Sequence, residues 1–313
     1  MKKMNVSGIK LIKSHRDSYL PAVRLYSKRV SSSYFLPKLS RFINEFIYGL
    51  GIGAALNRYD NSFTTYLSSA DRRLYEKYSV DEIFCNFGSG AFYHNKWKNY
   101  DYPGQSDYYV NLQGVKGKHY TPIDLCATEL HIPENDSSVA LIYSGHTLEH
   151  LEANSAINFL RECYRILKSG GVMRLALPSN TNNFDFNRYL NMQNGSNENL
   201  KDKYKRETAS HVLTDTKNLS IEDINELFLK SNGQPKQFYD LASKRVSVKF
   251  DGANPERHIT FWDYEKLINL MREIGFSLCI PVYQGSSTVP PFTNINVFDT
   301  TEPHMSFYVE VVK

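Results

Sequence analysis

The sequence predicts an α/β protein built on a mostly parallel sheet with helices covering its faces. Short apolar strands alternate with an amphipathic helix between residues 81 and 178, and several of the strands end in glycine, serine or aspartate. This alternation is typical of doubly wound sheets, in which ligands bind beyond the carboxyl ends of the strands. We therefore expect the functional site at those strand ends.

Five strands are expected in this segment, at residues 81–87, 96–100, 119–123, 139–144 and 172–177. Before the fifth, apolar residues recur on one face of a 3.6-residue helix. They are Ala156, Ile157, Leu160, Cys163, Tyr164 and Leu167. Gly170 and Gly171 follow this helix and are expected to end it.

The rest of the chain completes the sheet. Residues 221–230 predict a short helix, and a second helix begins at Asp263 and ends at Gly275. Strands are expected at 276–282 and 306–312. The sheet would then have seven strands, with the last one as an antiparallel strand at its edge.

Two further segments frame this core. Residues 1–80 form an N-terminal extension with helical character, for which a lid, a dimer contact and a membrane contact are all open roles. Residues 81–313 form the main domain, interrupted at about 179–256 by a polar insertion rich in asparagine. Insertions at the ligand-facing edge of a sheet often determine acceptor specificity, although a simple surface loop is the alternative.

Composition narrows the class of protein. The net charge of +4 over 313 residues does not predict nucleic-acid binding. Residues 1–41 hold ten Lys or Arg residues and one acid, so this arm is either solvated or contacts an anionic membrane surface.

The start of the chain does not resemble a signal peptide, and the apolar run at 42–56 is too short to span a bilayer. We expect a cytoplasmic protein, with peripheral contact at the inner membrane as the alternative.

Candidate ligand-binding residues follow the predicted strands. The run Gly88-Ser89-Gly90 follows the first strand, Asp101 the second and Asp124 the third, and Ser144 ends the fourth. Each aspartate alone is more often a cap or turn residue, but residues at successive strand ends favour a shared ligand.

A nicotinamide dinucleotide is disfavoured as that ligand. Its fingerprint needs a third glycine at the position of Tyr93, so a nucleoside without a pyrophosphate fits better. Asp101 is placed to accept hydrogen bonds from ribose hydroxyls, and Asp124 and Leu125 to meet an adenine edge and face.

Together these motifs resemble those of class I S-adenosylmethionine-dependent methyltransferases. The similarity rests on residues 84–90, 97–101, 122–125, 144–151 and 165–178. It implies a Rossmann-like fold with S-adenosylmethionine as cofactor. The residues that it implies for cofactor binding are Asn86, Gly88, Ser89, Gly90, Asp101, Tyr102, Asp124, Leu125 and Ser144. Asn86 stands where many relatives carry an acid, which removes an ionic contact to the methionine ammonium.

Within that class, the motifs resemble those of methyltransferases encoded with bacterial surface-polysaccharide genes. The resemblance implies O-methylation of a glycan or lipid-linked saccharide, and at its narrowest of O-2 of a terminal perosamine in an O-antigen. Two alternatives remain: a methyltransferase for a small metabolite or protein amine, and a non-catalytic, membrane-associated assembly factor that keeps the fold. A homo-oligomer is compatible with each.

A sugar hydroxyl needs a general base or a metal ion to lose its proton. His146, Glu149 and His150 stand at i, i+3 and i+4, and share one face if this segment is helical. His146 is then a base oriented by Glu149 or His150, or the three residues bind a divalent metal, or they are structural. His258, just before the late helix, is a second candidate base.

Overall fold

The computed structural model describes residues 74–90, 94, 96–103, 120–179, 205–207, 209–294, 297–299 and 306–313. Most of the predicted N-terminal extension, Tyr93 and the asparagine-rich part of the insertion lie outside these residues. Within them, no helix has the length and apolar character that crossing a bilayer requires.

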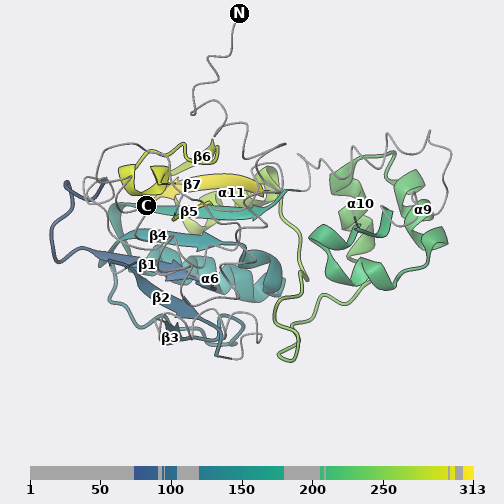
Figure 1. Cartoon of the computed structure of the whole chain (residues 1–313), viewed down its shortest axis with the longest axis horizontal. Coiled ribbons are helices and arrows are strands. Elements are labelled where there is room, and N and C mark those ends of the chain that lie inside the picture. Colours follow the sequence, from purple (N-terminus) through teal and green to yellow (C-terminus); the bar gives the residue numbers. More distant parts are fainter. Residues whose placement is uncertain are drawn as a thin grey trace, which may run out of the picture.

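The described chain forms a seven-stranded sheet with strand order β3-β2-β1-β4-β5-β7-β6 (Figure 1). The strands are β1 (Ile83–Phe87), β2 (Lys98–Asp101), β3 (Thr121–Pro122), β4 (Val139–Gly145), β5 (Leu167–Pro178), β6 (Leu278–Val282) and β7 (Ser306–Val312). The first five strands pair in parallel, and β7 runs antiparallel to both β5 and β6. The predicted mostly parallel α/β fold is confirmed.

The antiparallel strand lies inside the sheet, whereas the sequence predicted it at the edge. β7 is buried along nearly its whole length and pairs on both sides, whereas β6 is half-exposed. Pro281 lies in β6, and proline has no N–H to donate to a further strand. These properties make β6 the better edge strand.

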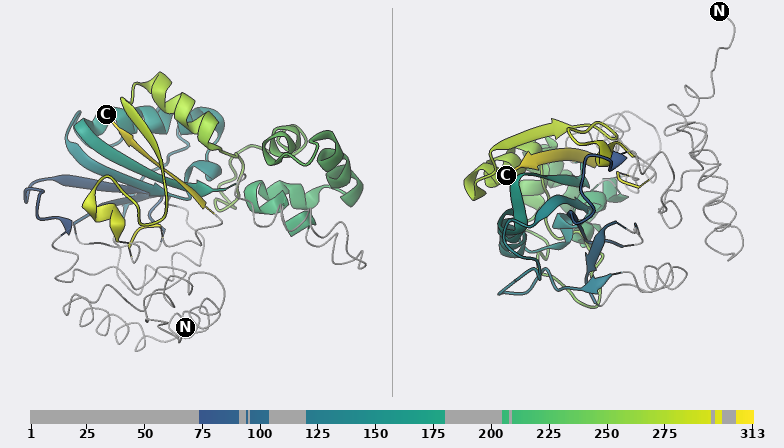
Figure 2. Two further views of the ribbon diagram at one scale, coloured as in Figure 1. Left: turned by 90° about the horizontal axis from the view of Figure 1, so that it is seen from above. Right: turned by 90° about the vertical axis from the view of Figure 1, so that its left-hand side faces the viewer.

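One face of the sheet packs against α6 (Ala153–Ile166) and α11 (Tyr264–Ile274), and Figure 2 shows both helices on the same side. On the other face, the described residues that pack against the sheet come from the segment around Tyr75, from Trp97 just before β2 and from the β6–β7 connection. That connection includes the 3₁₀ helix η3 (Pro290–Thr293). The predicted end of α11 at Gly275 is confirmed, since Gly275 adopts a left-handed conformation with φ of 119°.

Helix α6 ends earlier than the sequence predicted. Leu167 is already extended and pairs with Val139 of β4, so the helix stops at Ile166. Gly170, with φ of 72°, instead turns the chain inside β5, where its N–H donates to the Lys313 carbonyl at 2.9 Å.

The insertion contains a helical lobe with its own core. The lobe includes the 3₁₀ helix η2 (Thr214–Asn218), α9 (Ile221–Lys230) and α10 (Pro235–Ala242). The predicted bounds of α9 are confirmed, and a reciprocal capping box between Ser220 and Asp223 begins it. The lobe stands beside the sheet near the ends of β4 and β5 (Figure 1), and its core includes Leu227, Phe238 and Tyr239.

Candidate active site

The glycine loop after β1 packs tightly against the segment after β4. Gly88 has φ of 66°, and a Cβ added there would lie 2.0 Å from Thr147 Oγ1. Thr147 Oγ1 also donates to the Phe87 carbonyl at 3.2 Å. Only glycine fits this position, because Thr147 fills the space that a Cβ would need.

Asp101, at the end of β2, turns its carboxylate into the same loop. Its oxygens accept hydrogen bonds from Gly90 N at 2.5 Å, Ser89 Oγ at 3.3 Å and Tyr102 N at 2.7 Å. Burial raises the pKa of Asp101. A carboxylate has about four lone-pair sites, so room for about one more donor remains. The structure therefore brings the predicted glycine loop and Asp101 together.

The other predicted cofactor residues have varied surroundings. Asn86 is buried within β1 and donates from Nδ2 to Asn99 Oδ1 at 3.2 Å. Ser144 is buried at the end of β4, and its Oγ has no hydrogen-bond partner in the described part of the chain. Tyr102 contacts the ring of Phe250, which belongs to the returning end of the insertion.

Two of these residues follow β3. Asp124 is exposed, and its Oδ1 accepts a hydrogen bond from Cys126 N at 2.8 Å, which is a turn contact. Leu125 is buried in the main core, where it packs in the same cluster as Tyr100.

The segment after β4 is not the α-helix on which the shared-face prediction depended. His146 has a left-handed φ of 53°, and only Leu148–His150 forms a 3₁₀ turn, η1. His146 N donates to the Ala176 carbonyl at 2.8 Å, so pairing with β5 continues through this residue. The chain therefore leaves the sheet one residue after the end of β4.

The predicted side chains nevertheless meet at the Glu149 carboxylate. Glu149 is 1% exposed, and its Oε1 lies 3.0 Å from His146 Nδ1 and 4.0 Å from His150 Nε2. His146 Nε2 lies 2.9 Å from Ser306 Oγ at the start of β7. Ser306 carries no motif signal in the sequence, because it reaches His146 through a contact between distant parts of the chain.

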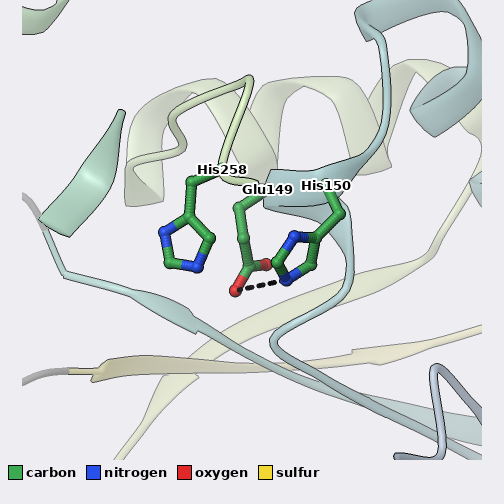
Figure 3. A group of neighbouring side chains, drawn as sticks. All are labelled: Glu149, His150 and His258. Atoms are coloured by element: carbon green, nitrogen blue, oxygen red, sulfur yellow. Dashed lines mark ion pairs between the residues drawn. The ribbon is translucent and has the colours of Figure 1, made fainter. Parts of the chain in front are cut away.

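The insertion brings His258 to the same place. Ile259 N and Thr260 N both donate to the Glu149 carbonyl, at 2.7 and 3.0 Å. The rings of His258 and His150 are consequently 4.9 Å apart, and Figure 3 shows both rings beside the Glu149 carboxylate.

The electrostatics separate the two candidate bases. Burial favours the neutral form of Glu149, but the contact from His146 and the neighbouring histidines outweigh it and lower the pKa of Glu149 to about 2. Burial lowers the pKa of His258 to about 3. His258 is therefore a weak proton acceptor at neutral pH.

Comparison with known protein families finds a methyltransferase domain in this chain. Residues 105–175 match a methyltransferase domain family. A search of curated protein sequences finds no significant match. The matched segment contains β3, β4, α6 and most of β5, and the sheet as a whole has a Rossmann-like methyltransferase fold.

Several solved structures that are similar to this chain are described as methyltransferases. An S-adenosylmethionine-dependent methyltransferase from Archaeoglobus fulgidus is 12% identical with a TM-score of 0.40, covering 77% of this chain and 90% of that one. One from Aquifex aeolicus is 11% identical with a TM-score of 0.34, covering 77% and 88%. A possible histamine N-methyltransferase from Thermotoga maritima is 14% identical with a TM-score of 0.36, covering 88% and 97%. These values carry no information about the substrate of this chain.

The residues present fit the adenosyl cofactor that this class uses. Gly88 and Gly90 reduce the number of side chains in the loop after β1, and Asp101 beside it keeps room for about one more hydrogen-bond donor, such as a ribose hydroxyl. The buried Ser144 hydroxyl, which has no partner within the described residues, lies at the end of the neighbouring strand β4.

Proposed function

We propose that this chain transfers a methyl group from S-adenosylmethionine to a hydroxyl group, with a saccharide of a bacterial surface glycan as the acceptor. The observation that carries the proposal is the contact between His146 and Glu149 beside the end of β4, at 3.0 Å. An alcohol has a high pKa and needs such a base, whereas a neutral amine already has a nucleophilic lone pair.

In this proposal each member of the pair has its own role. Glu149 is a buried anion, so the proton of the neutral His146 ring is placed on Nδ1, facing its carboxylate. Nε2 then keeps its lone pair, and at present it faces the Ser306 hydroxyl. Glu149 would hold the ring in this tautomer and stabilise the imidazolium that forms, as carboxylates do in other catalytic dyads.

The cofactor, when bound, supplies an electrophilic methyl group on a sulfonium. The acceptor oxygen forms a bond to the methyl carbon as the carbon–sulfur bond breaks, and that electron pair stays on sulfur. The acceptor proton passes to His146 Nε2. The protein otherwise orients the two reactants and excludes water.

The saccharide class has two supports. The sequence motifs resemble those of surface-polysaccharide methyltransferases, and the helical lobe of the insertion borders the site. His258 N donates to Thr214 Oγ1 at 2.9 Å, which joins the lobe to the histidine cluster. A bordering lobe suits an extended acceptor, and O-2 of a terminal perosamine is the narrowest form of this proposal.

The role of His146 is tested by replacing it with alanine. We expect His146→Ala to lower the rate of methyl transfer by about 10²- to 10⁴-fold, the usual contribution of a general base. Binding of S-adenosylhomocysteine, measured by calorimetry, should stay nearly unchanged. His131→Ala is the matched control, since that side chain is 74% exposed and contacts Glu162 instead. Normal turnover by His146→Ala would contradict the assignment.

The acceptor is tested by mass spectrometry of surface glycan from cells with and without this chain. We expect the mass of one methylene group per modified sugar to be lost without it. Separate extraction of lipid-linked precursors distinguishes the two saccharide sources. If the glycan masses are identical while the purified protein methylates an amine, the alternative substrate class is correct.

A further inference from the structure

The described residues contain a group of side chains that is suited to a metal ion. Glu149, His150 and His258 each offer one ligand atom, and these atoms all lie within 4.8 Å of one another. Figure 3 shows the two imidazole rings on either side of the carboxylate. The sequence predicted a metal set of His146, Glu149 and His150, and the fold replaces His146 with His258.

The hydrogen bonds of the two rings determine which nitrogen faces the carboxylate. His150 Nδ1 lies 3.0 Å from the Arg257 carbonyl, and His258 Nδ1 lies 2.8 Å from the His211 carbonyl. A carbonyl oxygen only accepts, so each Nδ1 carries the proton of its neutral ring. Each Nε2 therefore keeps a lone pair. His150 Nε2 points that lone pair toward Glu149 Oε1, 4.0 Å away.

This is the arrangement that metal-binding histidines adopt. Their second ring nitrogen nearly always donates to a carbonyl or a carboxylate, which orients the ring and sets the tautomer. The carboxylate is held by a close charged contact instead, because His146 Nδ1 lies 3.0 Å from Glu149 Oε1. Glu149 Oε2 is buried and has no hydrogen-bond partner in the described residues. Three electron-rich groups thus face one another, and a cation between them would relieve their repulsion.

We propose that Glu149, His150 and His258 together bind a divalent transition-metal ion, with the acceptor hydroxyl as a further ligand. Two imidazole nitrogens with one carboxylate suit Zn²⁺, Co²⁺ or Fe²⁺ better than Mg²⁺, which prefers oxygen. Metal–ligand distances of about 2.0–2.2 Å place two ligands of one ion up to about 4 Å apart, so only a small contraction is needed.

Three protein ligands leave a coordination position open, as in catalytic zinc sites. An acceptor oxygen bound there would lose its proton more easily, and His146 would take that proton. This catalytic role of the ion depends on the proposed function. Binding of the ion does not depend on it.

The site is tested by titrating the untagged, chelator-treated full-length protein with Co²⁺, without cofactor or acceptor. We expect one ion per chain and a visible absorption band from bound Co²⁺. His150→Ala and His258→Ala should each lose the band, and His131→Ala, with its exposed side chain, should keep it. Circular dichroism and thermal unfolding of each metal-free variant show whether its fold is intact.

A second measurement needs no variant. X-ray absorption of the zinc-loaded wild-type protein should show about two imidazole ligands and an oxygen at distances near 2.0–2.2 Å. Cysteine sulfur among the ligands would overturn the proposal. So would a wild-type protein that binds no Co²⁺, or a band that survives in the His150→Ala/His258→Ala double variant.

The outcomes also separate this site from the proposed function. If the protein binds the ion but methylates no hydroxyl, the proposed metal site is supported and the proposed function is wrong. If methyl transfer continues at its full rate after complete metal removal, the proposed function is supported and the proposed catalytic role of the ion is wrong.

Discussion

Both the backbone conformation and the packing of Gly88 require glycine at this position. Its φ of 66° disfavours any side chain, and the Thr147 hydroxyl occupies the space that a Cβ would need. Gly170 has nearly the same conformation, with φ of 72°, but a Cβ there would have no atom within 4 Å. The two glycines therefore differ in packing alone.

We expect Gly88→Ala to destabilise the protein more than Gly170→Ala does. Both substitutions place alanine in a left-handed conformation, at a cost of about 1–3 kcal/mol. Gly88→Ala adds overpacking of about 1–3 kcal/mol and should also weaken S-adenosylhomocysteine binding. Urea unfolding and calorimetry measure the two effects. Equal stability of the two variants would show that the loop moves to accommodate the methyl group.

Helix α6 is held to the strand-connecting segment by a second charged cluster. Glu162 accepts hydrogen bonds from Arg165 and from Ile132 N, each at 2.8 Å. Burial raises the pKa of Glu162, but these donors and the charge of Arg165 outweigh it and lower the pKa overall. The cluster thus joins the last turns of the helix to the chain before β4.

This cluster gives the stability a pH dependence of known sign. A carboxyl group with a lower pKa in the folded state stabilises the protein above its unfolded pKa, and that contribution is lost as pH falls through the folded pKa. We expect Glu162→Gln to reduce the loss of unfolding free energy as pH falls below about 4.3, the usual pKa of an unfolded glutamate. Urea titrations at several pH values measure this, with Glu222→Gln on the exposed part of α9 as the control. Parallel profiles for wild type and Glu162→Gln would disprove the assignment.

Across the whole molecule, one buried cation connects the sheet to the chain between β6 and β7. Arg174 of β5 is fully buried and bonds to Asp299 and to Glu310, the latter at 2.6 Å. It also donates to the carbonyls of Tyr283 and Ser286, both at 2.9 Å. The β6–β7 connection is thereby fixed against the face opposite α6.

Replacing Arg174 with methionine should destabilise the protein strongly. The substitution leaves two buried carboxylates without their cation, and breaking a buried pair in this way costs about 3–5 kcal/mol. Arg245→Met, which breaks an exposed contact with Glu226 on α9, should change stability little. Denaturant midpoints compare the two variants. A small effect of Arg174→Met would mean that the carboxylates take up protons at little cost.

Much of the fold could be predicted from local patterns. The bounds of α9 and β7 match their predictions, because a capping box begins the helix and an apolar run forms the strand. The glycine loop and Asp101 were likewise predictable, since both stand directly after a recognisable strand. Such features depend on neighbours in the chain, which the sequence displays directly.

Only the tertiary structure decided which distant segments meet. Strand β7 lies inside the sheet because a strand buried along its length needs two partners, and no periodicity reveals which partners those are. His258 joins Glu149 and His150 because backbone hydrogen bonds return the insertion to the segment after β4. The sequence by itself determined the class of fold and the edge of the sheet at which the glycine loop and Asp101 meet. The grouping of Glu149, His150 and His258 depended on contacts between residues far apart in the chain, which spacing and composition do not encode.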